Sequence, residues 1–225
     1  MKIIIAAKHD RYKIVVKQLF KAGVYVEYCK TPKELNNAIN QPLKFDHIFF
    51  LHWSWVVPKT VFKKIHCVIF HMTDLPYGRG GSPLQNLIER GHTDTMISAI
   101  VCDSAIDSGA VYCRRKLCLG GSAEEILLRG AIIMAEMISE ILINKPKAVE
   151  QQGAPVYFKR RTPEQSKIDP DASLLKVFDK IRMLDADSYP RAFLEMGDLH
   201  FEFKDAKVEG NSIVAKVEIK KIETP

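Results

Sequence analysis

Two side chains that can carry protons, His71 and Asp107, stand 36 residues apart in this chain of 225 residues. The segments between them have the pattern of a helix and a strand, which would return the chain to the same edge of a sheet, so the two side chains can meet. A carboxylate beside an imidazole fixes its tautomer and raises its affinity for a proton. Such a pair suits proton transfer from an amine or donation to a developing oxyanion. Structural roles for an isolated histidine and an isolated aspartate are the alternative.

Three loops that follow predicted strands are candidate ligand sites, since ligands of open α/β sheets bind beyond the carboxyl ends of the strands. These loops comprise residues 8–11, 52–55 and 71–83. The third loop has three glycines within residues 78–81 ahead of a helix, and such a turn can offer backbone N–H groups to an anion. Neither GxGxxG nor GxxxxGK[ST] occurs in the chain. Their absence argues against a nicotinamide enzyme and a Walker-type nucleotidase.

Short apolar runs alternate with segments of helical period through the first part of the chain, which predicts a parallel sheet with right-handed crossovers. The predicted strands are 3–7, 24–29, 47–51 and 67–70, and helices are predicted around 14–20, 32–40, 58–64 and 82–90. An antiparallel hairpin of segments 95–101 and 111–119 follows. Ser122 and Glu125 form a capping box that opens a helix to about Asn144. The first 145 residues therefore form a doubly wound α/β unit.

The remainder of the chain is expected to form a small appendage. Residues 145–170 contain four prolines, which predicts an irregular connector. Only the segment PVYF within it can be a strand. A helix is predicted at 172–184, and two strands at 199–203 and 213–219 form a hairpin. So short a unit buries little apolar surface alone and should pack on the sheet unit. We therefore divide the chain into residues 1–165 and residues 166–225.

Composition and charge narrow the class of protein further. Hydrophobic residues make up 47% and charged residues 27%, which excludes a disordered or low-complexity chain. The net charge of +6 is dispersed, and dense basic runs such as Lys159–Arg161 are only three residues long, so a nucleic-acid partner is not favoured. Five cysteines without a CxxC spacing read as buried free thiols of a reducing compartment. No apolar run has the length of a signal peptide or a membrane span, and no metal-ligand spacing occurs, so we expect a cytoplasmic protein without a metal or membrane partner.

Four segments of the chain together resemble the folate-dependent formyltransferases. The segment VIFHMTDLPYGRGGSPLQNLI (68–88) is similar to the family pattern NxHxSLLPxxRGxxPxxxAI, and SAIDSGAVYCRRKL (104–117) to GxDTGxxxxxxxxxI. The segment WSWVVPKTVF (53–62) is similar to AYGxILPxxVL. The stretch IDPDASLLKVFDKIRMLDADSYPRAFLEMG (168–197) is similar to IDWxxxAxxxxxxIRALxxPYPGAFxxxxG. The combination is specific, although each piece alone is weak.

The resemblance implies a Rossmann-like formyltransferase fold, an α/β architecture with a mostly parallel sheet flanked by helices and a small appendage of one helix and a β-hairpin. It further implies transfer of a formyl group from 10-formyltetrahydrofolate to a primary amine, with His71 and Asp107 as the catalytic residues. The residues expected to bind the folate are Trp53, Ser54, Trp55, Leu75, Pro76, Arg79, Val101 and Asp103. The residues expected to bind the acceptor are Lys8, Arg11, Gly80, Gln85 and Tyr189.

The chain departs from the family at one position. The family has a third catalytic residue, an asparagine two positions before the histidine, where this chain has Ile69. The amide of that asparagine binds the formyl oxygen, and removal of one oxyanion donor costs on the order of a hundredfold or more in rate. Thr73, Asp74 and His52 are candidates to replace it. Alternatively, the protein is slow or has lost formyl transfer, and Ile69 is a plain core residue of its strand.

The resemblance leaves the acceptor to be predicted from length. Family members that act on initiator methionyl-tRNA are longer, with a complete β-barrel after the sheet domain, whereas shorter members act on nucleotide-linked amino sugars of cell-surface polysaccharides. About 40 residues follow position 188 here, so we expect a nucleotide-linked amino sugar. A formyl-folate hydrolase and a catalytically silent folate- or sugar-binding protein are the alternatives. A homodimer is possible, because exposed apolar positions of the appendage can face a partner subunit or the sheet unit.

Overall fold

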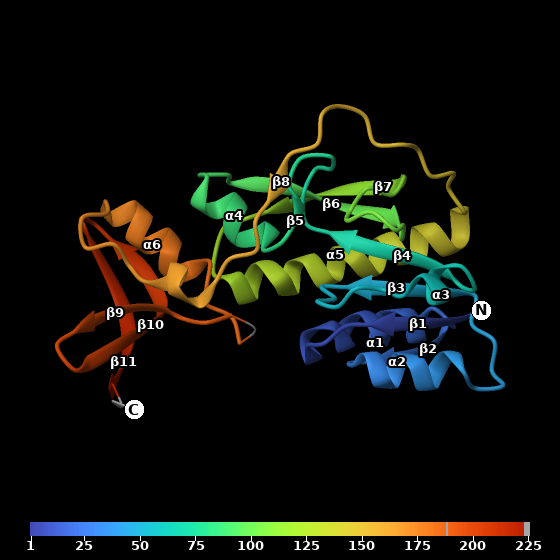
Figure 1. The fold of residues 1–225 in the computed structure, drawn as a ribbon, viewed down its shortest axis with the longest axis horizontal. Coiled ribbons are helices and arrows are strands. Elements are labelled where there is room, and N and C mark those ends of the chain that lie inside the picture. Colours follow the sequence, from blue (N-terminus) through green and yellow to red (C-terminus); the bar gives the residue numbers. More distant parts are fainter. Residues whose placement is uncertain (188, 223–225) are drawn as a thin grey trace.

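The computed structural model describes residues 1–187 and 189–222, and its main feature is a six-stranded sheet covered by helices on both faces (Figure 1). The strands run in the order β2-β1-β3-β4-β6-β7. The first four are parallel, and β6 is antiparallel to both its neighbours. Their bounds are β1 (Lys2–Ala6), β2 (Tyr25–Cys29), β3 (His47–Leu51), β4 (His66–His71), β6 (Asp94–Val101) and β7 (Val111–Cys118). The predicted α/β class, parallel strands and hairpin are confirmed.

The sheet is buried on both faces because successive residues of its central strands enter two different hydrophobic clusters. Ile3 and Ile5 of β1 pack with α1 and α5, whereas Ile4 packs with α2 and α3. Two-sided burial explains why these strands read as continuous apolar runs. The helices are η1 (Asp10–Tyr12), α1 (Lys13–Lys21), α2 (Pro32–Ile39), α3 (Lys59–Phe62), α4 (Pro83–Glu89) and α5 (Ala123–Asn144). Ser122 and Glu125 form the predicted capping box of α5. No helix among the described residues has the length and hydropathy to cross a bilayer.

The connector crosses the loop that follows β4 and pairs with it. Two-residue strands β5 (Arg79–Gly80) and β8 (Tyr157–Phe158) form a small parallel sheet, with Gly80 opposite Phe158. The segment PVYF is thus the strand of the connector, as predicted. This pairing fixes the course of the loop that carries the glycines.

The appendage contains a three-stranded sheet rather than a hairpin alone. The short helix η2 (Pro163–Ser166) lies in the connector, and the appendage consists of α6 (Leu174–Arg182), β9 (Ala192–Met196), β10 (Leu199–Glu209) and β11 (Ser212–Lys221). The strand order is β11-β10-β9. The sequence does not predict β9, because its five residues, AFLEM, are too few to show a clear alternation of apolar and polar positions. The appendage lies beyond the carboxyl ends of the parallel strands (Figure 1).

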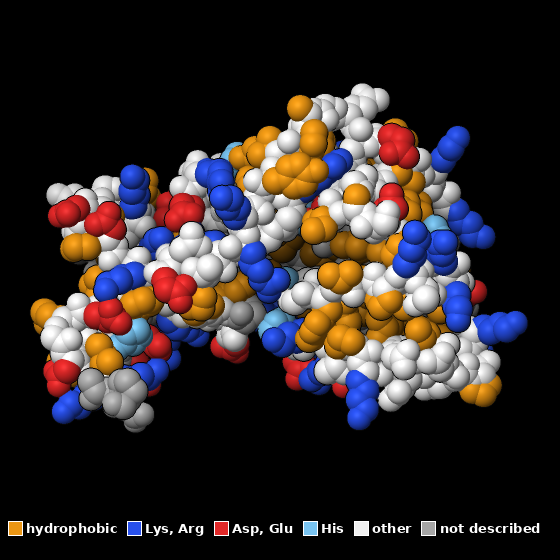
Figure 2. Space-filling view, in the orientation of Figure 1, with side chains coloured by type: hydrophobic (Ala, Val, Ile, Leu, Met, Phe, Trp, Pro, Cys, Tyr) orange, Lys and Arg blue, Asp and Glu red, His pale blue; other side chains and the backbone are white. Residues whose placement is uncertain are grey.

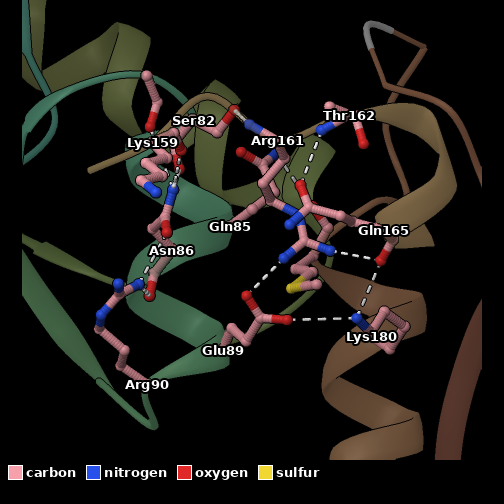
Figure 3. A network of polar contacts seen from close by, with 12 residues as sticks. Ser82, Gln85, Asn86, Glu89, Arg90, Lys159, Arg161, Thr162, Gln165 and Lys180 are labelled. Carbon is pink, nitrogen blue, oxygen red and sulfur yellow. Dashed lines mark hydrogen bonds and ion pairs between the residues drawn. The ribbon is translucent and has the colours of Figure 1, made fainter. Parts of the chain in front are cut away.

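A polar network joins the appendage and the connector to α4 (Figure 3). Glu89 at the end of α4 binds Arg161 of the connector and Lys180 of α6. Both cations also donate to the carbonyl oxygen of Gln165. The Asn86 amide donates to the carbonyl of Lys159, 3.1 Å away. Because the Arg161 side chain is only 8% exposed, its ion pair is shielded from water and contributes more than a surface pair does.

Glu89→Ala should loosen this connection, since it leaves Arg161 largely buried without its carboxylate. We expect a loss of about 1–3 kcal/mol in the free energy of unfolding, measured by urea denaturation. The matched control is Glu218→Ala, whose carboxylate is 62% exposed and contacts Lys220 at 3.6 Å; it should change stability by less than about 0.5 kcal/mol. Equal effects of the two substitutions would contradict this account of the docking.

Candidate functional site

The side chains of His71 and Asp107 meet beyond the carboxyl end of β4. Nδ1 of His71 lies 3.6 Å from Oδ2 of Asp107, and the two side chains are 8% and 13% exposed. His71 is the last residue of β4, and Asp107 lies in the loop between β6 and β7. Because β6 is antiparallel to β4 and ends opposite Val68, this loop turns back along β4 to bring Asp107 to His71. The predicted proximity of the two residues is confirmed.

The position of the proton on His71 follows from its second ring nitrogen. Nε2 lies 2.8 Å from the carbonyl oxygen of Gly78. A carbonyl oxygen only accepts, so Nε2 carries a proton, and Nδ1 of the neutral ring has the free lone pair. That lone pair faces the Asp107 carboxylate at a distance longer than a hydrogen bond. The pair is therefore arranged to accept one further proton between Nδ1 and Oδ2.

Gly80 holds the carboxylate in this position. Its backbone N–H donates to Oδ2 of Asp107 at 2.8 Å, and Asp107 itself has a φ of 50°, in the left-handed region. Gly80 has a φ of 106°, and a Cβ there would lie 2.5 Å from the carbonyl oxygen of Phe158. A glycine is thus required where β5 meets β8. The structure replaces the predicted acceptor contact of Gly80 with a structural one, since its N–H is already used by Asp107.

Gln151 of the connector ties Arg79 to the loop that carries Asp107. Its Oε1 accepts from Nε and Nη2 of Arg79 at 3.1 and 2.7 Å. Its Nε2 donates to the carbonyl oxygens of Asp107 and Gly109, both at 2.8 Å. The amide thereby uses both donors and accepts two bonds. Arg79 is committed to this contact rather than free for a folate, and Gln151 is a site residue that the sequence did not reveal.

The loops expected to bind the folate surround one apolar floor. Ile69 packs with Trp53 against the cluster that contains Cys102, and also against the cluster of Leu75 and Ile100. The loops after β3, β4 and β6 therefore converge beside His71. Figure 2 shows a hollow at this edge of the sheet, with apolar side chains inside it and Lys, Arg and His side chains at its margin.

The other predicted folate residues occupy the rim of these loops. The rings of Trp53 and Trp55 lie 4.7 Å apart, with the exposed Ser54 between them in sequence. Val101 ends β6, and the exposed Asp103 accepts hydrogen bonds from Ser104. A cavity of about 630 Å³ is lined by Leu75, Pro76 and connector residues, on the connector side of the loop after β4. Neither His71 nor Asp107 lines that cavity.

Two further predicted acceptor contacts, besides that of Gly80, are corrected by the structure. The Arg11 side chain is 5% exposed and lies 2.8 Å from a carboxylate oxygen of Glu124, so it is an internal ion pair. Gln85 is 2% exposed, and its amide donates to the carbonyl oxygen of Met183. Both residues connect elements of the fold. Lys8 remains exposed in the loop after β1.

Tyr189, the remaining predicted acceptor contact, reaches the sheet from the appendage. Its hydroxyl lies 3.3 Å from Nε2 of His52, and its ring centroid lies 6.0 Å from that of His52. The His52 ring also lies near those of His9 and Tyr12, at 5.9 and 6.4 Å. Burial and surrounding cations lower the pKa of His52 to about 3, so this imidazole is neutral.

Ile69 of β4 is half-buried and packs against two apolar clusters, so it is a packing residue at the margin of the core. Within residues 1–187 and 189–222, no hydrogen bond or ion pair joins any of the three candidate replacement donors to His71 or Asp107. The Thr73 hydroxyl faces the Gly78 carbonyl at 3.5 Å in the core. Asp74 lies 3.1 Å from Arg114 and is acceptor-only when ionised. His52 belongs to the aromatic group beside Tyr189. The wall beside His71 is therefore apolar where an amide was expected.

The chain is similar to known proteins over most of its length. A family model described as the methionyl-tRNA formyltransferase C-terminal domain matches residues 163–220. The chain is 27% identical over 191 residues to a methionyl-tRNA formyltransferase of Rickettsia africae, covering 82% of this chain and 62% of that protein. It thus spans about three fifths of the length of such curated relatives.

Among solved structures, a methionyl-tRNA formyltransferase from Clostridium thermocellum has 44% identity and a TM-score of 0.92, covering 98% of this chain and 99% of that one. A sugar N-formyltransferase from Shewanella sp has 12% identity and a TM-score of 0.63, covering 96% of both chains. The latter likeness shows the fold alone.

Gln151→Glu tests whether the amide holds the Asp107 loop. The substitution keeps an acceptor for Arg79 but turns a carboxylate oxygen toward the carbonyls of Asp107 and Gly109. We expect a loss of roughly 1–3 kcal/mol in the free energy of unfolding and faster hydrogen exchange of the amides of residues 101–110. Gln152→Glu adds the same charge at the neighbouring exposed position and should change neither quantity. Slow exchange in the Gln151 variant would show that the amide does not order the loop.

Proposed function

Because the chain belongs to the formyltransferase family, we propose that it transfers a formyl group from 10-formyltetrahydrofolate to the primary amine of a nucleotide-linked amino sugar. The observation that carries the proposal is the pairing of His71 with Asp107 beside an apolar hollow. In the reaction, the bound formyl-folate supplies the one-carbon group, and a carbon–nitrogen bond to the acceptor replaces the one to the folate nitrogen.

The His71–Asp107 pair manages the proton of this exchange. The attacking amine must be neutral and loses a proton once its nitrogen bonds to carbon. Nδ1 of His71 has the free lone pair, and the Asp107 carboxylate stabilises the imidazolium that results. The imidazolium can then return the proton to the departing nitrogen. Nε2 stays bonded to the Gly78 carbonyl throughout, which keeps Nδ1 turned toward the Asp107 carboxylate.

The apolar floor suits formyl transfer better than hydrolysis. The side chains of Ile69 and Leu75 offer no hydrogen bond to a water molecule. A formyl-folate hydrolase needs a positioned water in place of the amine. The same side chains fit the flat rings of a pterin, which bury apolar surface. A catalytically silent binding protein would show no turnover. Activity that depends on His71 and Asp107 would therefore distinguish the proposed enzyme from such a protein.

The charge of the appendage favours a small acceptor over a tRNA. Residues 166–225 contain 10 lysine and arginine residues against 12 aspartate and glutamate residues. A surface that grips tRNA phosphates needs the opposite balance. A small acceptor bound at the edge of the sheet does not depend on that surface.

A second candidate acceptor is methionyl-tRNA. The similarity to the Clostridium structure favours it, since that protein has this name and is matched over 99% of its chain. Length alone therefore does not exclude a tRNA acceptor. The two acceptors require different assays and can be told apart directly.

We further propose that the enzyme works in the cytoplasm. Cys29, Cys67 and Cys102 are buried free thiols, and no disulfide forms among the described residues. Burial raises the pKa of each thiol, which keeps it protonated and unreactive. Such thiols suit a reducing compartment.

His71→Asn and Asp107→Asn should each lower kcat for formyl transfer by about 10²–10⁴-fold, because the proton no longer has its carrier. The assay follows formylated acceptor and free formate separately, with nucleotide-linked amino sugars and methionyl-tRNA as acceptors. Binding of 5-formyltetrahydrofolate should be kept by both variants, which shows that the site still folds. Release of formate without a formylated product would instead identify a hydrolase, and unchanged turnover would overturn the assigned roles.

Ile69→Asn should raise kcat by roughly tenfold or more, since it places an amide donor on the same face of β4 as His71. Ile69→Ala is the matched control, because it removes the same packing without adding a donor. If both variants lose activity equally, the wall beside His71 is not where the oxygen charge develops. Stability is measured in parallel, as the new amide enters an apolar cluster.

A further inference from the structure

Four basic or imidazole side chains gather at the carboxyl ends of β1 and β3, and we call them the strand-end cluster: Lys8, His9, His52 and Arg160. They come from three separate segments, namely the loop after β1, the loop after β3 and the connector. The chain places β2 on one side of β1 and then crosses to the other side of β1 to form β3 and β4. The order in which strands are added to the sheet therefore switches between β1 and β3. Such a switch is the usual ligand position of an open α/β sheet.

Aromatic contacts fix the two imidazoles of the cluster. The His9 and His52 ring centroids lie 5.9 Å apart. Tyr28 donates to the carbonyl oxygen of His9 at 2.7 Å, and the hydroxyl of Tyr189 lies 3.3 Å from Nε2 of His52. His52 has a φ of 49°, which turns the chain at the end of β3. The rings are therefore held in place rather than free at the surface.

The cluster has an excess of positive charge. Burial and the nearby charges of Arg11 and Lys8 lower the pKa values of both His9 and His52. The charge of Arg160 also lowers the pKa of His52. The local acids are engaged elsewhere: Asp10 with Lys13 and Lys30, and Asp187 with Arg191. Arg11 is paired with Glu124. Over residues 1–187 and 189–222, no ion-pair partner is found for Lys8 or Arg160.

Two buried polar atoms beside the cluster also lack a partner. Nδ1 of His52 and the hydroxyl of Tyr12 have no hydrogen bond within the described part of the chain, and Tyr12 is 0% exposed. Buried polar groups are nearly always paired, and exceptions call for an explanation such as a ligand or water. Both atoms can donate to an oxyanion, since a hydroxyl and an imidazole N–H are donors.

The cluster lies at a defined distance from His71. Leu51 of β3 is opposite Phe70 of β4, so His52 and His71 each follow a paired residue on neighbouring strands. Neighbouring strands are about 4.8 Å apart, which places the end of β1 about 10 Å from the end of β4. An acceptor that spans this distance can present its amine to His71 and an anionic group to the cluster.

From these observations we infer that the strand-end cluster binds a phosphoryl group of the formyl acceptor, through Lys8, Arg160 and the imidazoles of His9 and His52. This inference rests on the proposed function, because it assigns the anionic end of the same acceptor. The phosphoryl group can belong to the diphosphate of a nucleotide-linked sugar or to the terminal phosphates of a tRNA. The chemistry of recognition is the same for both.

Pyrophosphate is the first probe, because its binding does not depend on catalysis. The full chain is titrated with inorganic pyrophosphate while the Cε1–H signals of His9 and His52 are followed by NMR. We expect binding that raises the pKa of His9, since an anion stabilises the imidazolium, and that weakens as salt is added. Lys8→Gln/Arg160→Gln should weaken it at least tenfold. Lys33→Gln/Lys63→Gln removes the same charge at an exposed position of α2 and at the exposed C-cap of α3, and should change the affinity less than twofold.

Kinetics then identify the source of the phosphoryl group. In the Lys8→Gln/Arg160→Gln enzyme, KM for the acceptor should rise at least tenfold, with kcat and the KM for 10-formyltetrahydrofolate within twofold of the parent. The acceptor that shows this rise, nucleotide-linked amino sugar or methionyl-tRNA, is the source.

The two proposals can fail separately. Pyrophosphate binding that is lost in the Lys8/Arg160 variant but kept in the control supports the site even if no formyl transfer is found, in which case the proposed function fails alone. Formyl transfer by an enzyme whose pyrophosphate binding or acceptor KM is unaffected by the Lys8/Arg160 substitutions overturns the site and leaves the function standing.

Discussion

The position of one carboxylate, that of Asp107, depends on contacts from three parts of the chain, and the site depends on that carboxylate. Gly80 donates a backbone N–H to it, Gln151 holds the carbonyl of the same residue, and His71 faces it with a lone pair. Each contact needs a particular backbone path. Gly80 can approach because β5 pairs with β8 and because glycine alone tolerates its φ so close to Phe158. The left-handed φ of Asp107 costs free energy, which the hydrogen bonds around it offset. The connector is thus part of the site rather than a simple link.

The apolar wall at Ile69 changes how this site can stabilise charge. An amide donor would interact with the developing oxygen charge in the low-dielectric hollow, where such a contact is strong. With isoleucine there, the positive charge that balances the developing oxygen charge comes from the proton that His71 takes up beside Asp107. The geometry is consistent with that role, since Nε2 is fixed by the Gly78 carbonyl and only Nδ1 can change its protonation. A site of this kind depends on the ionisation of one pair more than a site with a neutral amide donor does.

The sequence predicts the sheet well because its strands are buried on both faces and read as uninterrupted apolar runs, as at Ile3–Ala6 and His47–Leu51. It also predicts that His71 and Asp107 meet, although the expected crossover to the same edge is wrong: β6 is antiparallel to β4 and ends opposite Val68, so the loop after β6 must turn back to reach His71. It fails where a side chain is defined by a distant partner. The ion pair of Arg11 is formed with Glu124, which is distant in the sequence, so the sequence gives no sign of it. Likewise, the burial of Gln85 and its hydrogen bond to the Met183 carbonyl depend on a distant segment. Gln151 lies in a proline-rich connector without periodicity, so nothing in its surroundings marks it.

The appendage and the sheet unit contribute to one binding edge, which makes their connection a functional matter. Tyr189 reaches His52 from the appendage, and Arg160 stands in the connector directly before Arg161, whose ion pair with Glu89 fixes the connector on α4. Gly81 lies against the backbone of Arg160, so the loop after β4 and the strand-end cluster share a boundary. A shift of the connector would therefore move Arg160 away from the phosphoryl group and Gln151 away from Asp107 together. Affinity for the acceptor and the geometry of the proton carrier are coupled through this single segment of backbone.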